Sequence, residues 1–269
     1  MDDPAALLAA YDEQLRTDAE TPSAIAVERL GPLRLVTFAG GRGFITYQDL
    51  GGADADAIRA LVAQALARYE ADEQIRRVEW KTRGHDHAPG LHEALLEKGF
   101  VAEETESIMI GEAQALAVDV ELPEGVMVRR IFEEADVRAM SAMQAEAFGD
   151  SESEAVEKSE ALLRRLALDE AMQLWVGEAE GRVVTAGTLE PVPDTEFAGI
   201  WGGSTLEAWR GRGIYRALTA ARARSAIELG KSFIHSDSTE YSRPILERSG
   251  LLKVSTTTPY LWKRGATST

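Results

Sequence analysis

The feature that most constrains the fold is a short pattern that occurs twice, once near the end of each half of the 269-residue chain. Each copy has an apolar run, a loop, a short helical segment and a second apolar run. The helical segment ends at Gly99 in the first copy and at Gly250 in the second, and a glycine there is typical of a helix C-cap. Aligning the two glycines also pairs Leu95 with Leu246. Two such units can be similar by chance, but the pattern favours a tandem repeat of one α/β unit.

Hydrophobic periodicity predicts the element order β-α-α-β-β-β-α-β-α-β for the second half. The expected elements there are strand 126–131, helices 134–148 and up to 168, strands 173–178, 183–190 and 197–206, a helix up to 229, strand 232–236, a short helix from 243 and strand 252–261. The first half shows a similar order, with helices at 4–16 and 54–69 and strands around 24–28, 33–39, 43–47, 78–81 and 101–110. The predicted fold class is therefore α/β with mixed sheets: two tandem domains, each a mostly antiparallel sheet flanked by helices.

The polar segment 116–124 is predicted to link the two domains. We therefore expect four parts: a first domain at 1–115, the linker at 116–124, a second domain at 125–264 and a disordered tail at 265–269. At the entry to helix 54–69, the chain carries Asp49, Asp54 and Asp56. These acids suit a helix N-terminus but would repel a phosphate, so the first domain is expected to be a degenerate, structural copy.

The second half contains a glycine loop with the composition of a phosphate site. An apolar run precedes the loop and apolar residues at helical spacing follow it, so the order is strand, loop and helix. Gly211 and Gly213 can turn several backbone N–H groups outward. The helix N-terminus adds positive charge, and so do Arg210, Arg212 and Arg216. Together these features predict a pyrophosphate site, whereas a glycine pair alone would mark only a turn.

The formal net charge of −16 disfavours a nucleic-acid partner and an anionic membrane, because both are polyanions. This charge suits a cationic or neutral small molecule, or serves only solubility. The absence of cysteine excludes disulfides, thiolate metal sites and a cysteine nucleophile. The chain has no long apolar run and no signal-like N-terminus. We therefore expect a soluble, cytoplasmic protein that is a monomer or a homodimer.

The second half resembles the GCN5-related N-acetyltransferase (GNAT) family over about 126–263, through its element order and its glycine loop. The family motif R-x-x-G-x-G/A is matched by Arg210 and Gly213 and departs from the pattern at Tyr215, where the family usually has a small residue. The tyrosine is expected to narrow the pocket or to cover the cofactor differently. Because the first half looks like a degenerate copy of the same fold, the whole chain is similar to tandem GNAT proteins.

The resemblance implies one acetyl-CoA site per chain, in the second half. In the family, the strand before the loop splays from its neighbour and binds pantetheine through its backbone. Gly202 and Gly203 within this strand suggest a bulge or a close backbone approach, unless they only relieve crowding. The residues expected to hold acetyl-CoA are Ser204, Thr205, Leu206, Arg210, Gly211, Arg212, Gly213, Ile214, Tyr215, Arg216 and Ser242.

Acetyl transfer to an amine needs a base for the ammonium, a donor for the oxyanion and an acid for the leaving thiolate. The family often uses a tyrosine of the last helix as the acid, but this position is Leu246, so the role has moved, is filled by water or is absent. The nearest substitute is Tyr241, unless it only packs. Glu190 is the first choice for the base and Asp237 the second, although most acids in so acidic a chain face solvent. Without a cysteine, direct transfer in a ternary complex is the economical mechanism.

Two functions remain open. The first is an N-acetyltransferase that moves an acetyl group from acetyl-CoA to the amine of a small molecule. The second is a catalytically silent acyl-CoA-binding or interaction module, motivated by Leu246 and by the degenerate first half. Both would bind the cofactor, so thiol release with a panel of amines separates them. His85, His87 and His92 have a spacing that suits zinc, but they lie in a polar loop of the first half, and no metal site is expected.

Overall fold

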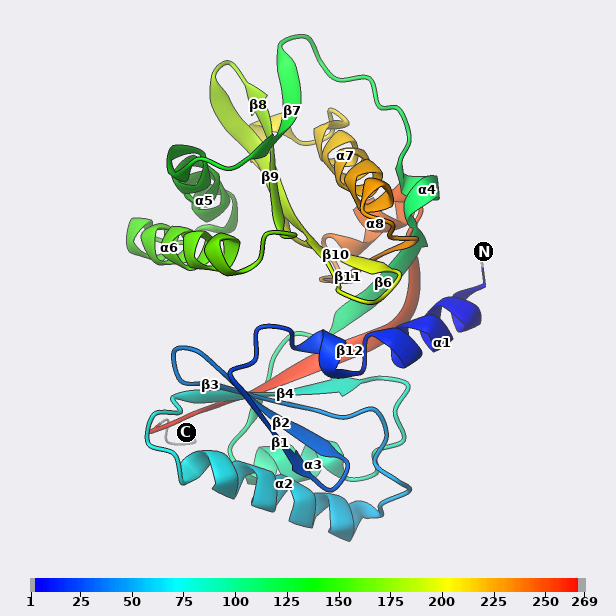
Figure 1. The fold of residues 1–269 in the computed structure, drawn as a ribbon, viewed down its shortest axis with the longest axis vertical. Coiled ribbons are helices and arrows are strands. Elements are labelled where there is room, and N and C mark those ends of the chain that lie inside the picture. Colours follow the sequence, from blue (N-terminus) through cyan, green and yellow to red (C-terminus); the bar gives the residue numbers. More distant parts are fainter. Residues whose placement is uncertain (1–2, 266–269) are drawn as a thin grey trace. The chain divides into compact units, whose positions relative to one another are not determined.

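The computed structural model describes residues 3–265 (Figure 1), which form two compact units. Neither unit is a continuous stretch of chain. The first unit contains Asp3–Ile108, Asp237–Arg243 and 253–265, and the second contains Met109–Ser236 and Pro244–Leu252. Of the tail predicted to be disordered, 265–269, all but the first residue lies outside the described residues. No helix in the described part of the chain is long and apolar enough to span a membrane.

The first unit has the strand order β1–β2–β3–β4–β12, with the short β5 beside β12. Its strands are β1 (Ala26–Leu30), β2 (Leu33–Phe38), β3 (Arg42–Thr46), β4 (Arg77–Arg83), β5 (Val101–Ala102) and β12 (Leu252–Lys263). Its helices are α1 (Pro4–Gln14), the 3-10 helix η1 (Asp18–Glu20), α2 (Ala55–Glu70) and α3 (Leu91–Glu97). Strands β3 and β4 pair in parallel, and α2 connects them, because parallel neighbours need a crossover. In Figure 1, α2 and α3 cover one face of this sheet and α1 lies on the other.

The second unit has the strand order β6–β11–β10–β9–β8–β7. Its strands are β6 (Glu106–Glu112), β7 (Val126–Ile131), β8 (Gln173–Ala179), β9 (Arg182–Pro191), β10 (Phe197–Thr205) and β11 (Phe233–Ser238). Its helices are α4 (Ala113–Leu116), α5 (Glu134–Phe148), α6 (Glu152–Leu168), η2 (Glu207–Trp209), α7 (Ile214–Glu228) and α8 (Arg243–Ser249). Here too a parallel pair, β10–β11, is connected by a helix, α7. Helices α5 and α6 cover one face of the sheet and α7 covers the other (Figure 1). The predicted fold class is confirmed.

The hairpin between β8 and β9 illustrates how local sequence determines these elements. Glu180 and Gly181 both have positive φ, 53° and 73°. This is the geometry of a type I′ turn, whose twist matches that of the two paired strands. The turn therefore sets the register that brings Ala179 opposite Arg182.

The last strand differs from its expected place. The sequence predicts that 252–261 completes the second domain, but β12 pairs with β4, with Tyr260 opposite Trp80. Strand β6, which comes from the first half of the sequence, instead lies beside β11 in the second unit. The repeat therefore holds for the helices that end before Gly99 and Gly250, while the strands that follow them are exchanged. Periodicity identifies a strand but not the edge that it joins, because pairing depends on distant residues.

Because of this exchange, the residues of the two compact units differ from the predicted continuous ranges 1–115 and 125–264. The segment 101–110, expected to be one strand, is divided between β5 and the start of β6. Helix α4 ends at Leu116, the first residue of the predicted linker. The domain boundaries themselves stay a prediction.

Candidate functional site

Strands β10 and β11 pair only at their beginnings. The parallel register joins Phe197–Gly199 to Phe233–His235 and extends no further within the described residues. On its other side, the register of β10 with β9 shifts between Trp201 and Ser204, and Gly202 has a φ of 60°. The bulge predicted at the glycine pair is confirmed. A bulge bends its strand, so the end of β10 separates from β11 and its backbone no longer belongs to that ladder.

Gly203 leaves room for the Tyr215 side chain. A Cβ atom at Gly203 would lie 2.4 Å from the Tyr215 hydroxyl oxygen and 2.8 Å from its Cε2 atom, distances that real Cβ contacts do not show. The tyrosine at the unusual motif position therefore packs against the bulge of β10. The second glycine of the pair relieves crowding, while the first adopts the backbone conformation of the bulge.

The glycine loop leads directly into α7. Gly211 and Gly213 have φ values of 73° and 79°, in the left-handed region that favours glycine. Gly213 is the N-cap of α7, and no side chain caps the helix. Since the first-turn N–H groups of a helix have no intrahelical acceptor, those of α7 are available to a ligand.

The arginines of the loop surround this helix start. Arg210 donates from Nε to the Thr205 carbonyl oxygen (3.0 Å). The Arg212 guanidinium lies 4.8 Å from the centre of the Trp209 ring, and Arg216 is exposed in the first turn. No acidic residue is present in that turn. Cations at the positive end of a helix dipole are unfavourable unless an anion binds between them, so the loop has the charge and geometry of an anion site.

At the corresponding helix of the first unit, α2, carboxylate side chains accept the backbone N–H groups at and before the helix N-terminus. The Asp54 side chain accepts the Ala57 N–H at 2.9 Å, and Asp49 accepts the N–H of Gly51. A phosphate at this position would meet two carboxylates instead of free N–H groups. That the first half has no phosphate site stays a prediction.

Glu190 lies on β9 directly opposite Gly199, the last residue of β10 that pairs with β11. Its carboxylate accepts hydrogen bonds from Arg165 Nη2 (2.7 Å) and Thr188 Oγ1 (3.2 Å). Thr188 is paired with Trp201, and directly paired residues of a sheet share a face. The face beside the separating strands therefore presents a carboxylate, a hydroxyl and an indole.

The other predicted site residues belong to the segment Asp237–Arg243, which is part of the first unit. Asp237 forms an ion pair with Lys81 (2.7 Å). Burial and the nearby Arg83 would lower the pKa of Lys81, but Asp237, Tyr11 and Glu20 hold it above its ordinary value. Tyr241 is 88% exposed, and the Ser242 hydroxyl lies 3.3 Å from the Thr239 carbonyl oxygen. The structure thus brings Asp237, Tyr241 and Ser242 together in one unit, and Glu190 and the glycine loop in the other.

Two of the three histidines with zinc-like spacing, His85 and His92, have hydrogen-bond partners. His85 Nδ1 lies 2.6 Å from Ser255 Oγ, and His92 Nδ1 lies 2.8 Å from the Tyr260 hydroxyl. Among residues 3–265, no group of three His, Cys, Asp or Glu side chains is arranged to hold a metal ion.

Arg222 is a residue of interest that sequence reasoning missed. It is fully buried on α7 and donates to the Thr188 carbonyl oxygen (3.1 Å) and to Thr219 Oγ1 (3.3 Å). In the described part of the chain, no carboxylate lies within ion-pair distance of it. Burial lowers the pKa of Arg222, and the adjacent Tyr215 offsets part of this effect. Its sequence signal was an arginine at helical spacing from apolar core positions, four residues after Leu218.

Leu246, at the position where the family often has a tyrosine, is buried in an apolar cluster with Ile234 and Leu251. The position therefore serves the core of the second unit. Tyr215 is the only tyrosine among the described residues of that unit.

No protein-family model and no curated protein matches the chain. Solved structures match nearly all of it. A GCN5-related N-acetyltransferase from Kribbella flavida is 16% identical, with 99% of this chain and 97% of that chain covered and a TM-score of 0.69. A tandem GNAT protein from the clavulanic acid biosynthesis pathway is 13% identical, with 98% and 97% covered and a TM-score of 0.64.

A conserved protein of unknown function from Staphylococcus epidermidis is 12% identical, with 92% of this chain and 97% of that chain covered and a TM-score of 0.70. At such identities the likeness concerns the fold. It extends over both halves, as the repeat in the sequence predicts. The chain therefore has the fold of the tandem GCN5-related N-acetyltransferases.

Proposed function

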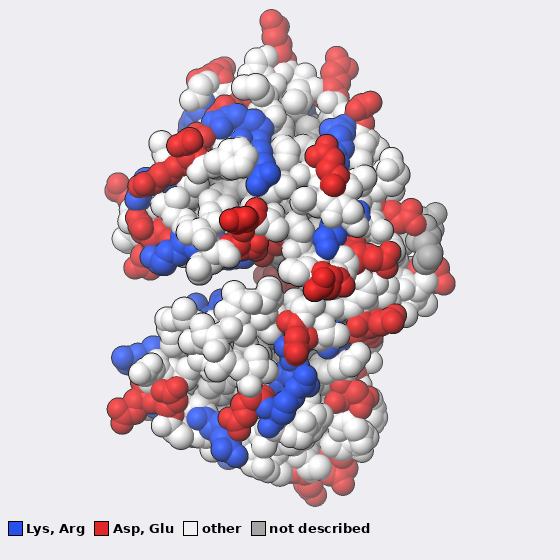
Figure 2. Space-filling view, viewed as in Figure 1, with Lys and Arg blue, Asp and Glu red and all other residues white. Residues whose placement is uncertain are grey.

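We propose that the protein is an N-acetyltransferase that moves an acetyl group from acetyl-CoA to the amine of a small molecule, at one site in the second unit. The GNAT fold supports acetyl transfer in general. The observation that carries the proposal is the separation of β10 from β11 beside an uncapped helix start with three arginines. On the face that Figure 2 shows, acidic and basic side chains are interspersed, and the formal net charge is −16. A neutral or cationic acceptor suits this charge better than a polyanion.

The residues of the second unit fit acetyl-CoA. The N–H groups of the loop and of the first turn of α7, from Gly211 to Arg216, suit the pyrophosphate. At the bulge, Ser204 Oγ is buried without a hydrogen-bond partner among the described residues, so it can meet the pantetheine together with Thr205. Leu206 contributes less than the sequence suggests, because its N–H donates to Val184 and its carbonyl accepts from Trp209.

We assign the base to Glu190 and the acid to Tyr215. Bound acetyl-CoA supplies the thioester. Glu190 takes the proton from the acceptor ammonium, after which the nitrogen–carbon bond forms as the carbon–sulfur bond breaks. The Tyr215 hydroxyl, which lies against Gly203 at the bulge, gives its proton to the departing sulfur. The buried Arg222 cation beside Tyr215 stabilises the phenolate that remains until it is reprotonated.

The test is release of free thiol from acetyl-CoA across a panel of small amines, together with acetyl-CoA affinity by calorimetry. We expect turnover with at least one amine. Glu190→Gln should lower it by about 100-fold, within the range of general-base catalysis, while leaving acetyl-CoA affinity unchanged. The double variant Arg210→Glu, Gly213→Asp should abolish acetyl-CoA binding. Tight binding without turnover for any amine would instead identify the chain as a silent acyl-CoA-binding module.

A further inference from the structure

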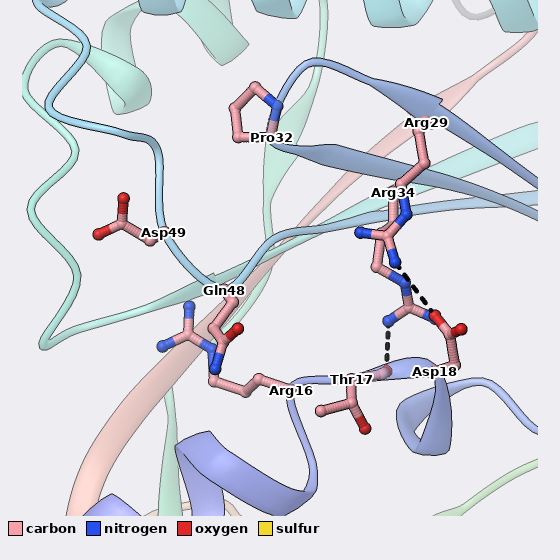
Figure 3. Close-up of a pocket in the computed structure, with 8 residues that line it drawn as sticks. All are labelled: Arg16, Thr17, Asp18, Arg29, Pro32, Arg34, Gln48 and Asp49. Atoms are coloured by element: carbon pink, nitrogen blue, oxygen red, sulfur yellow. Dashed lines mark hydrogen bonds and ion pairs between the residues drawn. The ribbon is translucent and has the colours of Figure 1, made fainter.

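The first unit contains a pocket of about 490 Å³ that plays no part in the proposed acetyl transfer. It lies between the end of α1, the β1–β2 hairpin and the residues that follow β3 (Figure 3). Eight residues line it, and the charged ones are Arg16, Arg29, Arg34, Asp18 and Asp49. Three cations and two anions give this lining a net charge of +1, in a chain whose net charge is −16. The pocket is thus locally basic in an acidic protein.

Arg34 and Arg16 are the buried cations of this pocket, and only 4% of the Arg34 side chain is exposed. The Arg34 guanidinium donates to the Thr17 carbonyl oxygen and to Thr21 Oγ1 (2.8 Å). Its Nε is buried and has no acceptor within residues 3–265. Burial lowers the pKa of Arg34, and nearby carboxylates offset this effect only in part. A guanidinium keeps its proton in proteins, so Arg34 stays charged in the folded protein. Its carboxylate neighbours are Asp18 and, at 4.0 Å from Nη1, Glu20.

The carboxylate of Asp18 occupies the position beside Arg29 and Arg34 that an anionic ligand would take. This carboxylate lies 3.1 Å from Arg34 Nη2 and 3.4 Å from Arg29 Nη2, and the two guanidinium groups converge on it in Figure 3. The side chains of Asp18 and Arg29 are 80% and 63% exposed. The exposed Arg29–Asp18 ion pair contributes little to stability, and a ligand that displaces Asp18 would take its place beside the buried Arg34. An incoming anion would then face two guanidinium groups, the arrangement that proteins use for carboxylates and phosphates.

Arg16 has a different role. It binds both carboxylate oxygens of Asp86, at 2.8 and 3.0 Å, and donates to the Tyr47 carbonyl oxygen at 2.9 Å. Its charge is therefore matched inside the protein, and Arg16 forms a wall of the pocket. The ligand-binding capacity lies with Arg29 and Arg34.

We propose that this pocket binds a small anion through a carboxylate or phosphate group, held by Arg29 and Arg34, with Asp18 as the carboxylate that the ligand displaces. The first unit then has a ligand of its own. This site lies on the side of the sheet that carries α1 and is separate from the start of α2, where carboxylates exclude a phosphate.

Calorimetric titration of the full chain with inorganic phosphate and, separately, with succinate tests the proposal. Arg29→Ala should weaken binding of the preferred probe by about fivefold, the scale of one exposed ion pair. Asp18→Asn should tighten it by about threefold, because a competing carboxylate is removed. Arg68→Ala is the matched control: Arg68 is also exposed, at 60%, and faces the carboxylate of Glu28 at 3.7 Å, but it lies on α2 outside the pocket.

The two probes separate a phosphate ligand from a carboxylate ligand, and binding of either one supports the proposal if the variants respond as expected. Absence of binding of both probes at about 10 mM, in the wild type and in Asp18→Asn, overturns it, because this concentration would fill most of a site with a Kd of about 1 mM. Equal losses in Arg29→Ala and Arg68→Ala overturn it too, since they would indicate general attraction of anions.

Discussion

Gly203 and Tyr215 depend on each other, because the space that a side chain at 203 needs is filled by the phenol ring. Gly203→Ala should lower the free energy of unfolding by about 1–3 kcal/mol, the usual cost of overpacking. Removing the ring as well, in Gly203→Ala with Tyr215→Ala, should recover most of this cost relative to Tyr215→Ala alone. Urea denaturation of the four proteins measures this coupling. Additive effects of the two substitutions would show that the ring does not pack at the bulge.

Arg222 is an unmatched buried cation, and its desolvation opposes folding. Arg222→Met should therefore keep the free energy of unfolding within about 1 kcal/mol of the wild type. Turnover should fall about tenfold, with an unchanged KM for acetyl-CoA, because the phenolate of Tyr215 loses its neighbouring charge. Arg224→Met, at an exposed position of the same helix, is the control. Loss of stability without loss of turnover would assign Arg222 a structural role alone.

At the scale of elements, the start of α7 is arranged for a ligand at the expense of the helix itself. Arg216→Glu puts an acid where the helix dipole favours one, so it should stabilise the free protein by about 0.3–1 kcal/mol. The same substitution should weaken acetyl-CoA binding about tenfold, because it brings a negative charge to the phosphate site. Thermal melts without ligand and calorimetry with acetyl-CoA measure the two effects.

Arg164→Glu is the control for this prediction, since Arg164 is exposed on α6. Arg164→Glu should neither stabilise the free protein by this amount nor weaken acetyl-CoA binding. If Arg216→Glu left acetyl-CoA affinity intact, the loop would not be the phosphate site.

The carboxylate of Glu20 connects η1 to β3 and β4. It forms an ion pair with Arg83 of β4 and accepts a hydrogen bond from Thr46 Oγ1 of β3 at 2.8 Å. Burial alone would raise the pKa of Glu20, but Arg83 and Lys81 hold it below its ordinary value of 4.5. A carboxyl whose pKa is lower in the folded state stabilises the fold above its unfolded pKa, and this contribution is lost as the pH falls through the folded pKa.

The stability difference between the wild type and Glu20→Gln should therefore be largest at neutral pH and shrink below about pH 4.5. Urea denaturation of both proteins across that range gives the difference. The two proteins are compared because burial raises the pKa of Glu79, which changes stability with pH in the opposite direction. This effect is present in both proteins and cancels in the difference. A difference that stays constant with pH would mean that Glu20 does not titrate in this way.

At the scale of the whole molecule, the exchange of strands makes each unit depend on chain from the other half. A fragment of residues 1–115 lacks β12, which pairs with β4 and supplies Tyr260 to the core around Trp80. We expect this fragment to be unfolded or aggregated when expressed alone, because an unpaired edge and a core surface are exposed. Joining 252–264 to it through a flexible linker should restore a cooperative unfolding transition, measured by circular dichroism. Cooperative unfolding of the fragment without β12 would contradict the exchange.

Much of the fold is predictable because its signals are local. The hairpin turn at Glu180 and Gly181, the bulge at the glycine pair of β10 and the bounds of α5 follow from residues that lie close together in the sequence. The phosphate loop belongs to the same class, since its glycines and arginines are consecutive. Arg222 and the basic pocket of the first unit were missed, because their partners lie far apart along the chain and an isolated arginine resembles a surface residue.

Sequence alone determined that this chain has two α/β copies, that only the second has a cationic loop before its crossover helix, and that the first has acids at the matching place. Only the tertiary structure decided which edge β6 and β12 join, which arginine is buried, and where Glu190, Asp237 and Tyr241 stand. The physical reason is how far apart along the sequence the interacting residues lie. Helices, turns and loop charges depend on neighbours within a few residues, whereas strand partners, desolvation and pockets depend on side chains that meet only after the chain has folded.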